Sequence, residues 1–325
     1  MTMVLLLDLL HIFYHLLPLL LCVPKAFGLH GRGYHNHSKE LELPTDLPNI
    51  TYDSGEYQML IAGGYKPLKN TLTKYVVSIR TSRATAYFGD NHFCVGSIIS
   101  DNLIMTAAHC VVDRRKVVTR PHRLVVVAGA PNRFQKLQTT VEMKVQDVLP
   151  HEHFKRKGAH DIALLRLVHH FPDDNDFVKI IGLANKMVQP GTSCQILGWG
   201  QLFFRGPYSA HAIVANLTVY SQEYCRMFYR HHFHETMICA GKQGVWDADA
   251  CRGDSGGPLI CNGEVVAIVS WGSHCGEKGK PTIFTSVYHH RDWIKIASGS
   301  ETMRRLIKSQ HFFLNLLLIY FLLQT

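Results

Sequence analysis

The sequence predicts an all-β fold, a barrel or a sandwich, for the region after residue 60. Ten short apolar runs recur there, each four to nine residues long, rich in β-branched residues and separated by turn residues. Hydrophobic residues make up 46% of the chain and charged residues 18%, which is typical of a folded protein rather than a disordered one. We find no repeat with a fixed period of about 20–50 residues, which argues against a solenoid.

The predicted strands are short enough for a barrel or a sandwich. They lie at residues 74–80, 95–100, 123–129, 141–148, 161–167, 193–200, 212–220, 258–261, 264–272 and 282–288. One helix is predicted at residues 290–297, with the sequence HRDWIKIA, and it closes the folded region.

The first 60 residues differ from this pattern. Residues 1–26 are mostly apolar and end in small residues, as in a secretory signal peptide. Asp8, His11 and His15 interrupt the apolar run, so an anchoring segment is the alternative. Residues 27–60 contain Gly and Pro and little periodicity, and we expect a propeptide.

The C-terminal end, residues 299–325, also differs. Small residues at 298–300 precede a polar spacer at 301–311 and an apolar tail at 312–323. The tail has 12 residues, too few to span about 30 Å of hydrocarbon as a helix. The order of small residues, spacer and tail predicts a GPI-attachment signal. The alternatives are an amphipathic segment on a membrane surface and a tail without a role.

The formal net charge of +9 favours anionic partners, such as a sulfated glycan or a membrane surface. Two basic runs, at residues 113–123 and 153–160, are either an exosite for such a partner or a solvated face. We find no nucleic-acid motif and expect no nucleic-acid partner. Three sequons are permissive glycosylation sites, at Asn36, Asn49 and Asn216.

The chain has 21 histidines and nine cysteines. Histidines spaced as possible metal ligands occur at 151 and 153 and at 231, 232 and 234, but we expect them on the surface and predict no metal site. Cys22 lies in the predicted signal peptide. The other eight cysteines lie between residues 94 and 275, and their even number predicts disulfides in an oxidising compartment. No CxxC pair is present, which argues against a zinc ribbon, and about 105 pairings of eight cysteines are possible.

Three residues carry candidate chemistry. His109 lies in MTAAHC, Asp161 begins the apolar run DIALLRL, and Ser255 lies in the Gly-rich stretch GDSGGP. A serine hydroxyl needs a neighbouring base to act as a nucleophile, and histidine suits that task because its pKa is near neutrality. The histidine in turn needs a carboxylate that fixes its tautomer. Gly253 and Gly256 flank the serine and would let the backbone approach a substrate closely.

Seven motifs in this order, IAGG, TAAHC, DIALLRL, LGWG, MICAG, GDSGGP and SWG, resemble those of the trypsin-like, or chymotrypsin-family, serine proteases. The resemblance covers residues 61–298. It implies two packed six-stranded antiparallel β-barrels with a C-terminal helix and a catalytic site between the barrels. It implies the triad His109, Asp161 and Ser255, and an oxyanion hole formed by Gly253 and Ser255. No cofactor is expected.

The resemblance also implies how the cysteines pair and what the protein acts on. The expected disulfides are Cys94–Cys110, Cys194–Cys261, Cys225–Cys239 and Cys251–Cys275. The expected partners are protein or peptide substrates, and we expect a monomer that is secreted or anchored at the cell surface through its C-terminus.

The resemblance implies a primary specificity pocket with two opposing features. Asp249 would lie at the pocket base, as in relatives that cleave after Arg or Lys. Ser270, Trp271 and Gly272 would form its side. Thr282 occupies a position where trypsin-like relatives usually carry glycine, and it would narrow the pocket. Cleavage after Arg or Lys and a restricted preference both remain open.

In this family a zymogen is cut before a residue equivalent to Ile61, whose new ammonium pairs with the acid preceding the nucleophile, here Asp254. The residue before the cut is Leu60, so activation by a trypsin-like enzyme is not expected. Another protease would have to cut there. The alternative is a latent or non-proteolytic binding protein on the same fold.

Overall fold

The computed structural model describes residues 64–66, 71–203, 205–242, 250–272 and 280–299. All of them belong to one compact unit. The predicted signal peptide and propeptide lie outside the described residues, as does the C-terminal tail after residue 299. Within the described ranges no helix is long and apolar enough to cross a membrane.

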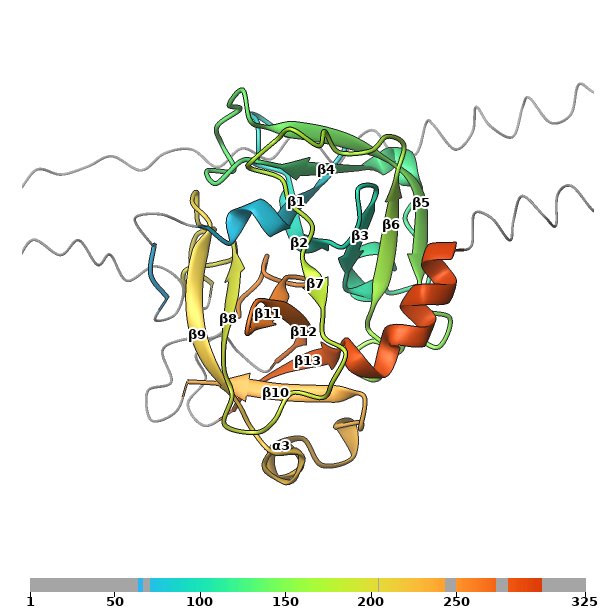
Figure 1. Ribbon diagram of the computed structural model, residues 1–325, viewed down its shortest axis with the longest axis vertical. Coiled ribbons are helices and arrows are strands. Elements are labelled where there is room, and N and C mark those ends of the chain that lie inside the picture. The colour runs from blue at the N-terminus through green and yellow to red at the C-terminus, as the bar shows by residue number, and fades with distance from the viewer. Residues whose placement is uncertain (1–63, 67–70, 204, 243–249, 273–279, 300–325) are drawn as a thin grey trace, which may run out of the picture. The chain divides into compact units, whose positions relative to one another are not determined.

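The N-terminal half of the folded unit is a closed antiparallel barrel (Figure 1). Around the barrel the strands follow the order β1-β2-β3-β6-β5-β4. Their bounds are β1 Val76–Thr81, β2 His92–Ile98, β3 Leu103–Thr106, β4 Leu124–Ala128, β5 Val141–Pro150 and β6 Ala163–Leu167.

The C-terminal half is a second closed barrel with the order β11-β8-β9-β10-β13-β12, in which β11 also pairs with β12. The strands are β8 Ser193–Gly198, β9 Ile213–Val219, β10 Met237–Gly241, β11 Pro258–Cys261, β12 Glu264–Trp271 and β13 Thr282–Ser286. A two-residue strand, β7 Gly182–Leu183, lies parallel to β12 and lengthens the sheet.

Each barrel has its own apolar core because alternate residues of every strand point inward. A third apolar cluster joins the two barrels. It combines residues of the first barrel, such as Val95 and Leu164, with residues of the second, such as Trp199 and Ile268, all of them buried. The barrels are therefore packed against each other by the hydrophobic effect.

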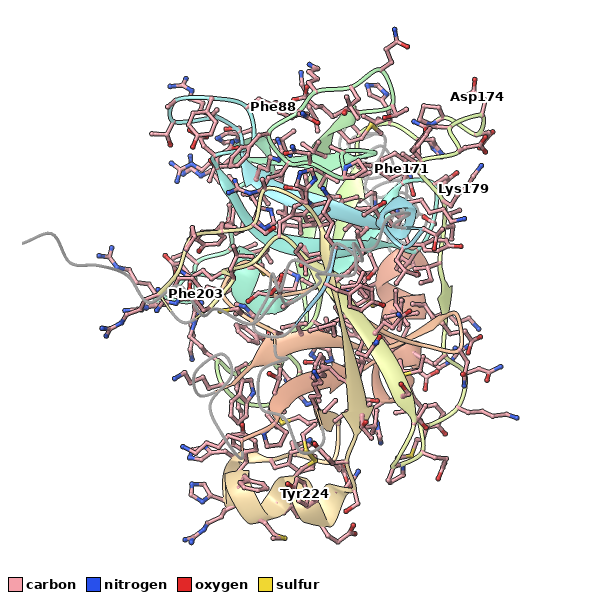
Figure 2. All side chains as sticks on the ribbon, turned by 90° about the vertical axis from the view of Figure 1, so that its left-hand side faces the viewer. Phe88, Phe171, Asp174, Lys179, Phe203 and Tyr224 are labelled. Atoms are coloured by element: carbon pink, nitrogen blue, oxygen red, sulfur yellow. A yellow bond between two sulfur atoms is a disulfide. The ribbon has the colours of Figure 1, made fainter. Side chains whose placement is uncertain are left out.

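Helices are few. They are α2 Ala108–Val111, α3 Gln222–Tyr229 and a C-terminal helix at 291–299, with short 3₁₀ turns η1 Thr73–Tyr75, η2 Pro121–Arg123, η3 Arg230–His232 and η4 Tyr288–His290. Figure 2 shows α3, marked by Tyr224, at the opposite end of the two barrels from Phe88 in the β1–β2 loop. The Ser221 hydroxyl caps α3 by accepting a hydrogen bond from the Tyr224 N–H, at 3.2 Å.

The predicted fold class is confirmed, and the C-terminal helix lies within two residues of its predicted bounds. Three strands and two helices among the described residues were missed, including the two-residue strand β7 and the four-residue helix α2. Strand β3 has only four residues and leads directly into MTAAHC, β10 coincides with MICAG, and α3 is an eight-residue helix. The Ser221 cap, followed by Glu223, was the available signal for α3.

Three disulfides join the described cysteines: Cys94–Cys110, Cys194–Cys261 and Cys225–Cys239. These are pairings that the family resemblance implies. Cys251 is also disulfide-bonded, and its expected partner Cys275 lies outside the described residues.

Candidate active site

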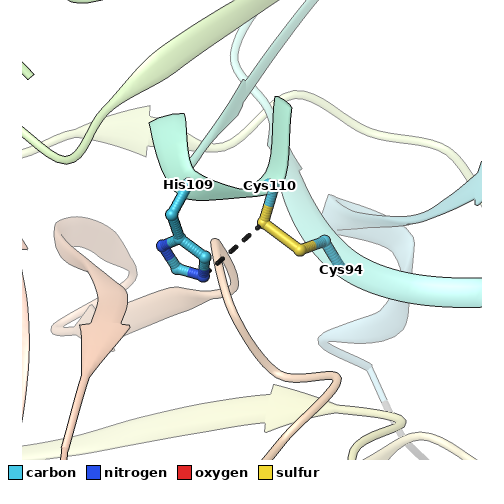
Figure 3. Close-up of side chains that lie close together, drawn as sticks. All are labelled: Cys94, His109 and Cys110. Carbon is cyan, nitrogen blue, oxygen red and sulfur yellow. Dashed lines mark hydrogen bonds between the residues drawn. A yellow bond between two sulfur atoms is a disulfide. The ribbon is translucent and has the colours of Figure 1, made fainter. Parts of the chain in front are cut away.

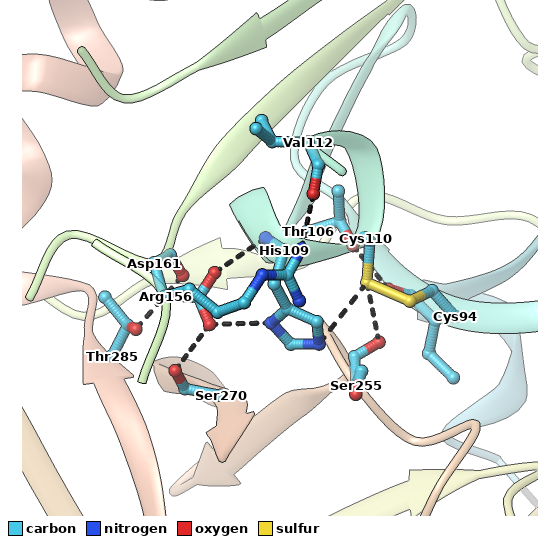
Figure 4. Close-up of polar contacts among 11 residues, drawn as sticks. Cys94, Thr106, His109, Cys110, Val112, Arg156, Asp161, Ser255, Ser270 and Thr285 are labelled. Carbon is cyan, nitrogen blue, oxygen red and sulfur yellow. Dashed lines mark hydrogen bonds and ion pairs between the residues drawn. A yellow bond between two sulfur atoms is a disulfide. The ribbon is translucent and has the colours of Figure 1, made fainter. Parts of the chain in front are cut away.

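Three segments that are distant in sequence meet between the barrels (Figure 4). His109 belongs to the short helix α2, which follows β3, and Asp161 lies two residues before β6. Ser255 lies in the turn that leads into β11 of the second barrel. Packing of the two barrels thus brings the candidate nucleophile to the candidate base.

Asp161 is a buried carboxylate, 1% exposed, with three hydrogen-bond donors. Its Oδ1 accepts from the His109 backbone N–H at 2.8 Å. Its Oδ2 accepts from His109 Nδ1 at 2.7 Å and from the Ser270 hydroxyl at 2.6 Å. The Thr285 hydroxyl donates to the Asp161 backbone carbonyl at 3.0 Å. These bonds explain a charge at the start of an apolar run, since a buried carboxylate needs such partners.

The Asp161 carboxylate sets the tautomer of His109. Because Nδ1 donates its proton to Asp161, Nε2 is left as the acceptor in the neutral ring. Nε2 faces Ser255 and the Cys110 sulfur, which lies 4.0 Å away (Figures 3 and 4). That sulfur also lies 3.7 Å from the Ser255 carbonyl oxygen. A disulfide sulfur carries no hydrogen, so these are packing contacts.

Among the described residues no hydrogen bond joins the Ser255 hydroxyl to His109 Nε2. Catalytic hydrogen bonds of this kind are often long in a substrate-free enzyme.

The backbone N–H groups around Ser255 differ in whether they have an acceptor among the described residues. The N–H groups of Asp254, Gly256 and Gly257 donate to backbone carbonyls at 2.8–3.0 Å. Those of Gly253 and Ser255 donate to no described residue. Gly253 and Gly256 have φ values of +100° and +77°, which favour glycine. A Cβ at Gly256 would lie 2.1 Å from Thr106 Oγ1, so this position excludes a side chain.

Asp254, the residue before Ser255, is 2% exposed. Its two carboxylate oxygens accept from the N–H groups of Gly200 at 2.8 Å and Cys251 at 3.0 Å. A Cβ at Gly198 or Gly200 would lie 2.1 or 2.3 Å from this carboxylate, so both glycines make room for it. Burial raises the pKa of the Asp254 carboxyl to about 6, against the effect of the two N–H donors.

Sequence reasoning missed a second histidine at the Ser255 loop. Nε2 of His92, which is 7% exposed, donates to the Gly253 carbonyl at 3.1 Å. Its Nδ1 accepts from the Ser78 hydroxyl at 2.8 Å, and Ser78 accepts from Arg80 Nε at 2.9 Å. Burial is the main cause that lowers the His92 pKa, to about 3. A histidine two residues before Cys94 in a strand carries no sequence signal for this role.

The family model for trypsin matches residues 61–294. The chain belongs to the trypsin family. As a member of this family it is a serine endopeptidase that acts on protein or peptide substrates.

Relatives and a solved structure agree with the family match. The chain is 35% identical to trypsin zeta of Drosophila melanogaster over 78% of its length and 90% of the relative. It is 34% identical to kallikrein-8 of Rattus norvegicus, over 67% of this chain and 82% of the relative. Its fold is similar to the structure of neuropsin, a serine protease expressed in the limbic system of mouse brain, with a TM-score of 0.62 and 29% identity over 72% of this chain and 98% of that one.

Among the described residues, those expected to bind substrate in this trypsin-family enzyme lie on or next to two neighbouring strands. Ser270 and Trp271 end β12, Gly272 follows, and Thr282 begins β13. Thr282 is 3% exposed, and a Cβ built at Gly272 would lie 3.6 Å from its hydroxyl. Asp249 and Ile61 lie outside the described residues.

One expectation about the histidines is wrong. His151 is not on the surface but buried, 8% exposed, because its ring lies between those of His160 and Trp293. His153, His231, His232 and His234 are exposed, as expected.

Proposed function

We propose that Ser255, His109 and Asp161 form the catalytic triad of this serine endopeptidase. His109 Nε2 takes the proton of Ser255 Oγ as that oxygen attacks the peptide carbonyl, and later gives the proton to the leaving amine. Asp161 stays ionised and stabilises the imidazolium that forms. Water then releases the acyl group from Ser255 by the same proton transfers.

The observation that carries this proposal is the pair of contacts from Asp161 to His109. One carboxylate oxygen holds the backbone of the histidine and the other holds its Nδ1 proton, at 2.8 and 2.7 Å. Ser270 and Thr285 hold the aspartate from the second barrel. A histidine bound only for packing would not need its tautomer and its backbone fixed by one buried acid.

We propose that the N–H groups of Gly253 and Ser255 form the oxyanion hole. Neither group has an acceptor among the described residues, and a developing oxyanion would satisfy both. Neutral backbone donors of this kind stabilise the transition state without a cofactor.

We propose cleavage after Arg or Lys, with Asp249 at the pocket base and a pocket that Thr282 narrows. The buried position of Thr282 opposite Gly272 supports the narrowing. An acid at the base favours a basic side chain through charge-assisted hydrogen bonds.

We propose that the chain is a zymogen activated by cleavage between Leu60 and Ile61. The buried Asp254 carboxylate supports this proposal, because it has two N–H donors but no cation among the described residues. A new ammonium at Ile61 would provide that cation, and breaking a buried pair of this kind costs roughly 3–5 kcal/mol. Leu60 requires an activator that cuts after Leu.

N-terminal sequencing of the native protein, with fluorophosphonate labelling of the same sample, tests the proposed function. We expect a start at Ile61 and a labelled Ser255. Ser255→Ala should abolish labelling, whereas Ser193→Ala, at an exposed serine, should leave it unchanged. Retention of residues 27–60 with no labelling would favour the latent binding protein instead.

We further propose a secreted protein, with glycosylation at Asn36, Asn49 and Asn216 and a GPI anchor near Ser298. Asn216 is exposed on β9, which supports its use as a glycosylation site.

Phosphatidylinositol-specific phospholipase C should release the GPI-anchored protein from cells. Retention on the membrane would contradict the anchor.

We propose that the two basic runs form an exosite for an anionic glycan. Arg156 of one run donates to the Val112 carbonyl beside the other, so the runs are neighbours near His109. Elution from heparin should require more salt for the wild type than for Arg114→Ser/Arg115→Ser. Identical elution would contradict the exosite.

A further inference from the structure

A cluster of histidines lies on the β5–β6 loop, which also carries Asp161, and on η4. His151 and His160 belong to that loop, and His290 belongs to η4, just before the C-terminal helix. Each of the three rings offers a nitrogen, and these nitrogens all lie within 4.8 Å of one another. The chain segments that supply them are about 130 residues apart, since His160 and His290 are separated by 130 positions.

The His290 ring is oriented as a metal ligand requires. It is 1% exposed, and its Nδ1 donates to the Ser286 backbone carbonyl at 2.7 Å. This bond fixes the tautomer and leaves Nε2 as an acceptor, whose lone pair takes a hydrogen bond from His160 Nδ1. A metal-binding histidine usually donates its other N–H to a carbonyl or carboxylate in this way.

The His160 ring already lies at nearly the distance from His290 that two ligands of one metal ion require. Nδ1 of His160 lies 3.0 Å from Nε2 of His290. Two nitrogens bound to one tetrahedral zinc at about 2.0–2.1 Å lie about 3.3 Å apart. An ion can therefore take the place of the proton that the two rings share. His160 has φ of +61°, a conformation that costs a non-glycine residue energy and is often found at functional sites.

His151 supplies the third nitrogen and is held from both sides. Its ring stacks on His160, with centroids 4.5 Å apart, and on Trp293 at 4.9 Å. Glu152 Oε2 accepts from Trp293 Nε1 at 2.9 Å and lies 3.8 Å from His151 Nδ1. His151 Nδ1 accepts a hydrogen bond from the His153 backbone N–H at 3.1 Å. The ring must release this bond, either to bind an ion through Nδ1 or to move its proton to Nδ1 so that Nε2 can bind. The His151 ring must turn to bring its nitrogen from at most 4.8 Å to about 3.3 Å from the others.

We propose that His151, His160 and His290 bind one Zn²⁺ ion, which joins the β5–β6 loop to the segment before the C-terminal helix. Three imidazoles select zinc or a similar transition metal over Ca²⁺ and Mg²⁺, which require oxygen ligands. The fourth position is open to water or to one of the exposed neighbours His153 and His234, whose rings lie 6.2 and 5.8 Å from that of His160. Because the loop ends at Asp161, the ion would hold the segment that carries a proposed triad residue.

A different group of described residues, Cys94, His109 and Cys110, is equally close together. Its two sulfurs form a disulfide and cannot act as thiolate ligands (Figure 3). The histidine cluster is therefore the better candidate.

Calorimetric titration of the full chain, stripped with EDTA and carrying Ser255→Ala to prevent self-digestion, tests the site. We expect one Zn²⁺ per molecule in the micromolar range or tighter, a higher Tm with zinc, and no binding of Ca²⁺ or Mg²⁺ at the same concentrations. His160→Gln should weaken zinc binding at least tenfold. His122→Gln, at an exposed histidine outside the cluster, should not change it.

Co²⁺ substitution and X-ray absorption of the wild-type protein provide a test that needs no variant. We expect the visible spectrum of a tetrahedral Co²⁺ site and about three nitrogen ligands near 2.0–2.1 Å for Zn²⁺. The proposal is overturned if the full chain binds no zinc, if the ligands are oxygens alone, or if folded His160→Gln binds zinc as the wild type does.

Discussion

Thr282, the first residue of β13, lies beside Gly272, which follows the neighbouring strand β12. A Cβ added at Gly272 would lie 3.6 Å from the Thr282 hydroxyl. Both positions belong to the proposed specificity pocket. A threonine there replaces open space with a methyl and a hydroxyl group, and it is 3% exposed, so it cannot easily turn away into solvent. The size of this side chain should therefore limit the substrate.

Thr282→Gly should raise kcat/KM for an Arg or Lys peptide substrate by about tenfold or more, because removing bulk from a pocket commonly changes discrimination by about 10–200-fold. Thr282→Ser keeps the hydroxyl and removes the methyl group, so its effect should be intermediate. Steady-state kinetics on activated enzyme, with Arg, Lys, Ala and Val substrates, measures this. A pocket not limited by Thr282 would give equal kcat/KM in all three proteins.

Asp161→Asn should lower kcat by about 10³–10⁴-fold with little change in KM, since the amide favours the wrong His109 tautomer. Asp147→Asn is a matched control, because Asp147 is a half-buried aspartate paired with Arg166 on β6, away from His109. Steady-state kinetics and circular dichroism of both variants separate catalysis from folding. Near-normal kcat in folded Asp161→Asn would contradict the proposed triad.

Asp254 should make the uncleaved protein less stable as pH rises. Its pKa is raised from 3.8 to about 6 in the folded state, so the unfolded chain releases the proton first. The stabilising effect of protonation is complete below pH 3.8 and is lost as pH rises through about 6. The difference in unfolding free energy between Asp254→Asn and the parent should therefore shift by about 2 kcal/mol in favour of Asn between pH 4 and pH 7.

Urea unfolding of uncleaved Ser255→Ala protein, with and without Asp254→Asn, measures this shift. The side-chain amide of the Asp254→Asn variant also changes the hydrogen bonds from the Gly200 and Cys251 N–H groups. This effect does not depend on pH, so it cancels when only the change in unfolding free energy with pH is compared. A difference that stays flat from pH 4 to pH 7 would show that the carboxylate is not destabilised by burial.

The contribution of His92 to the stability of the folded protein should have the opposite pH dependence, increasing as pH rises. Its pKa is lowered from 6.5 to about 3, so the unfolded chain takes up a proton before the folded chain does. Its contribution to stability is present above pH 6.5 and is lost as pH falls toward about 3. His92→Gln can still donate to the Gly253 carbonyl but does not titrate. Its Tm should fall less steeply than that of the parent between pH 6.5 and pH 4.5.

Scanning calorimetry of both proteins at several pH values checks this, and His122→Gln is an exposed control. Parallel Tm curves for His92→Gln and the parent would contradict a neutral, buried His92 bound to the Ser255 loop.

The sequence by itself determined the fold class, the family and the residues proposed as catalytic. Short β-branched runs predict strands because their side chains alternate between core and solvent, and motifs such as GDSGGP identify local backbone that only glycine permits. Local patterns of this kind require no knowledge of distant residues. They failed for β3, which has four residues, and for α3, whose capping signal is short.

Only the tertiary structure decided which side chains meet. The Ser270 hydroxyl reaches Asp161 across 109 positions, and His92 reaches the Gly253 carbonyl across 161. The burial of His151 and its approach to His160 and His290 likewise depend on packing of the C-terminal segment on the first barrel. Sequence spacing carries no information on such contacts. They arise because the hydrophobic effect packs the two barrels against each other and so brings together residues that are distant in the chain.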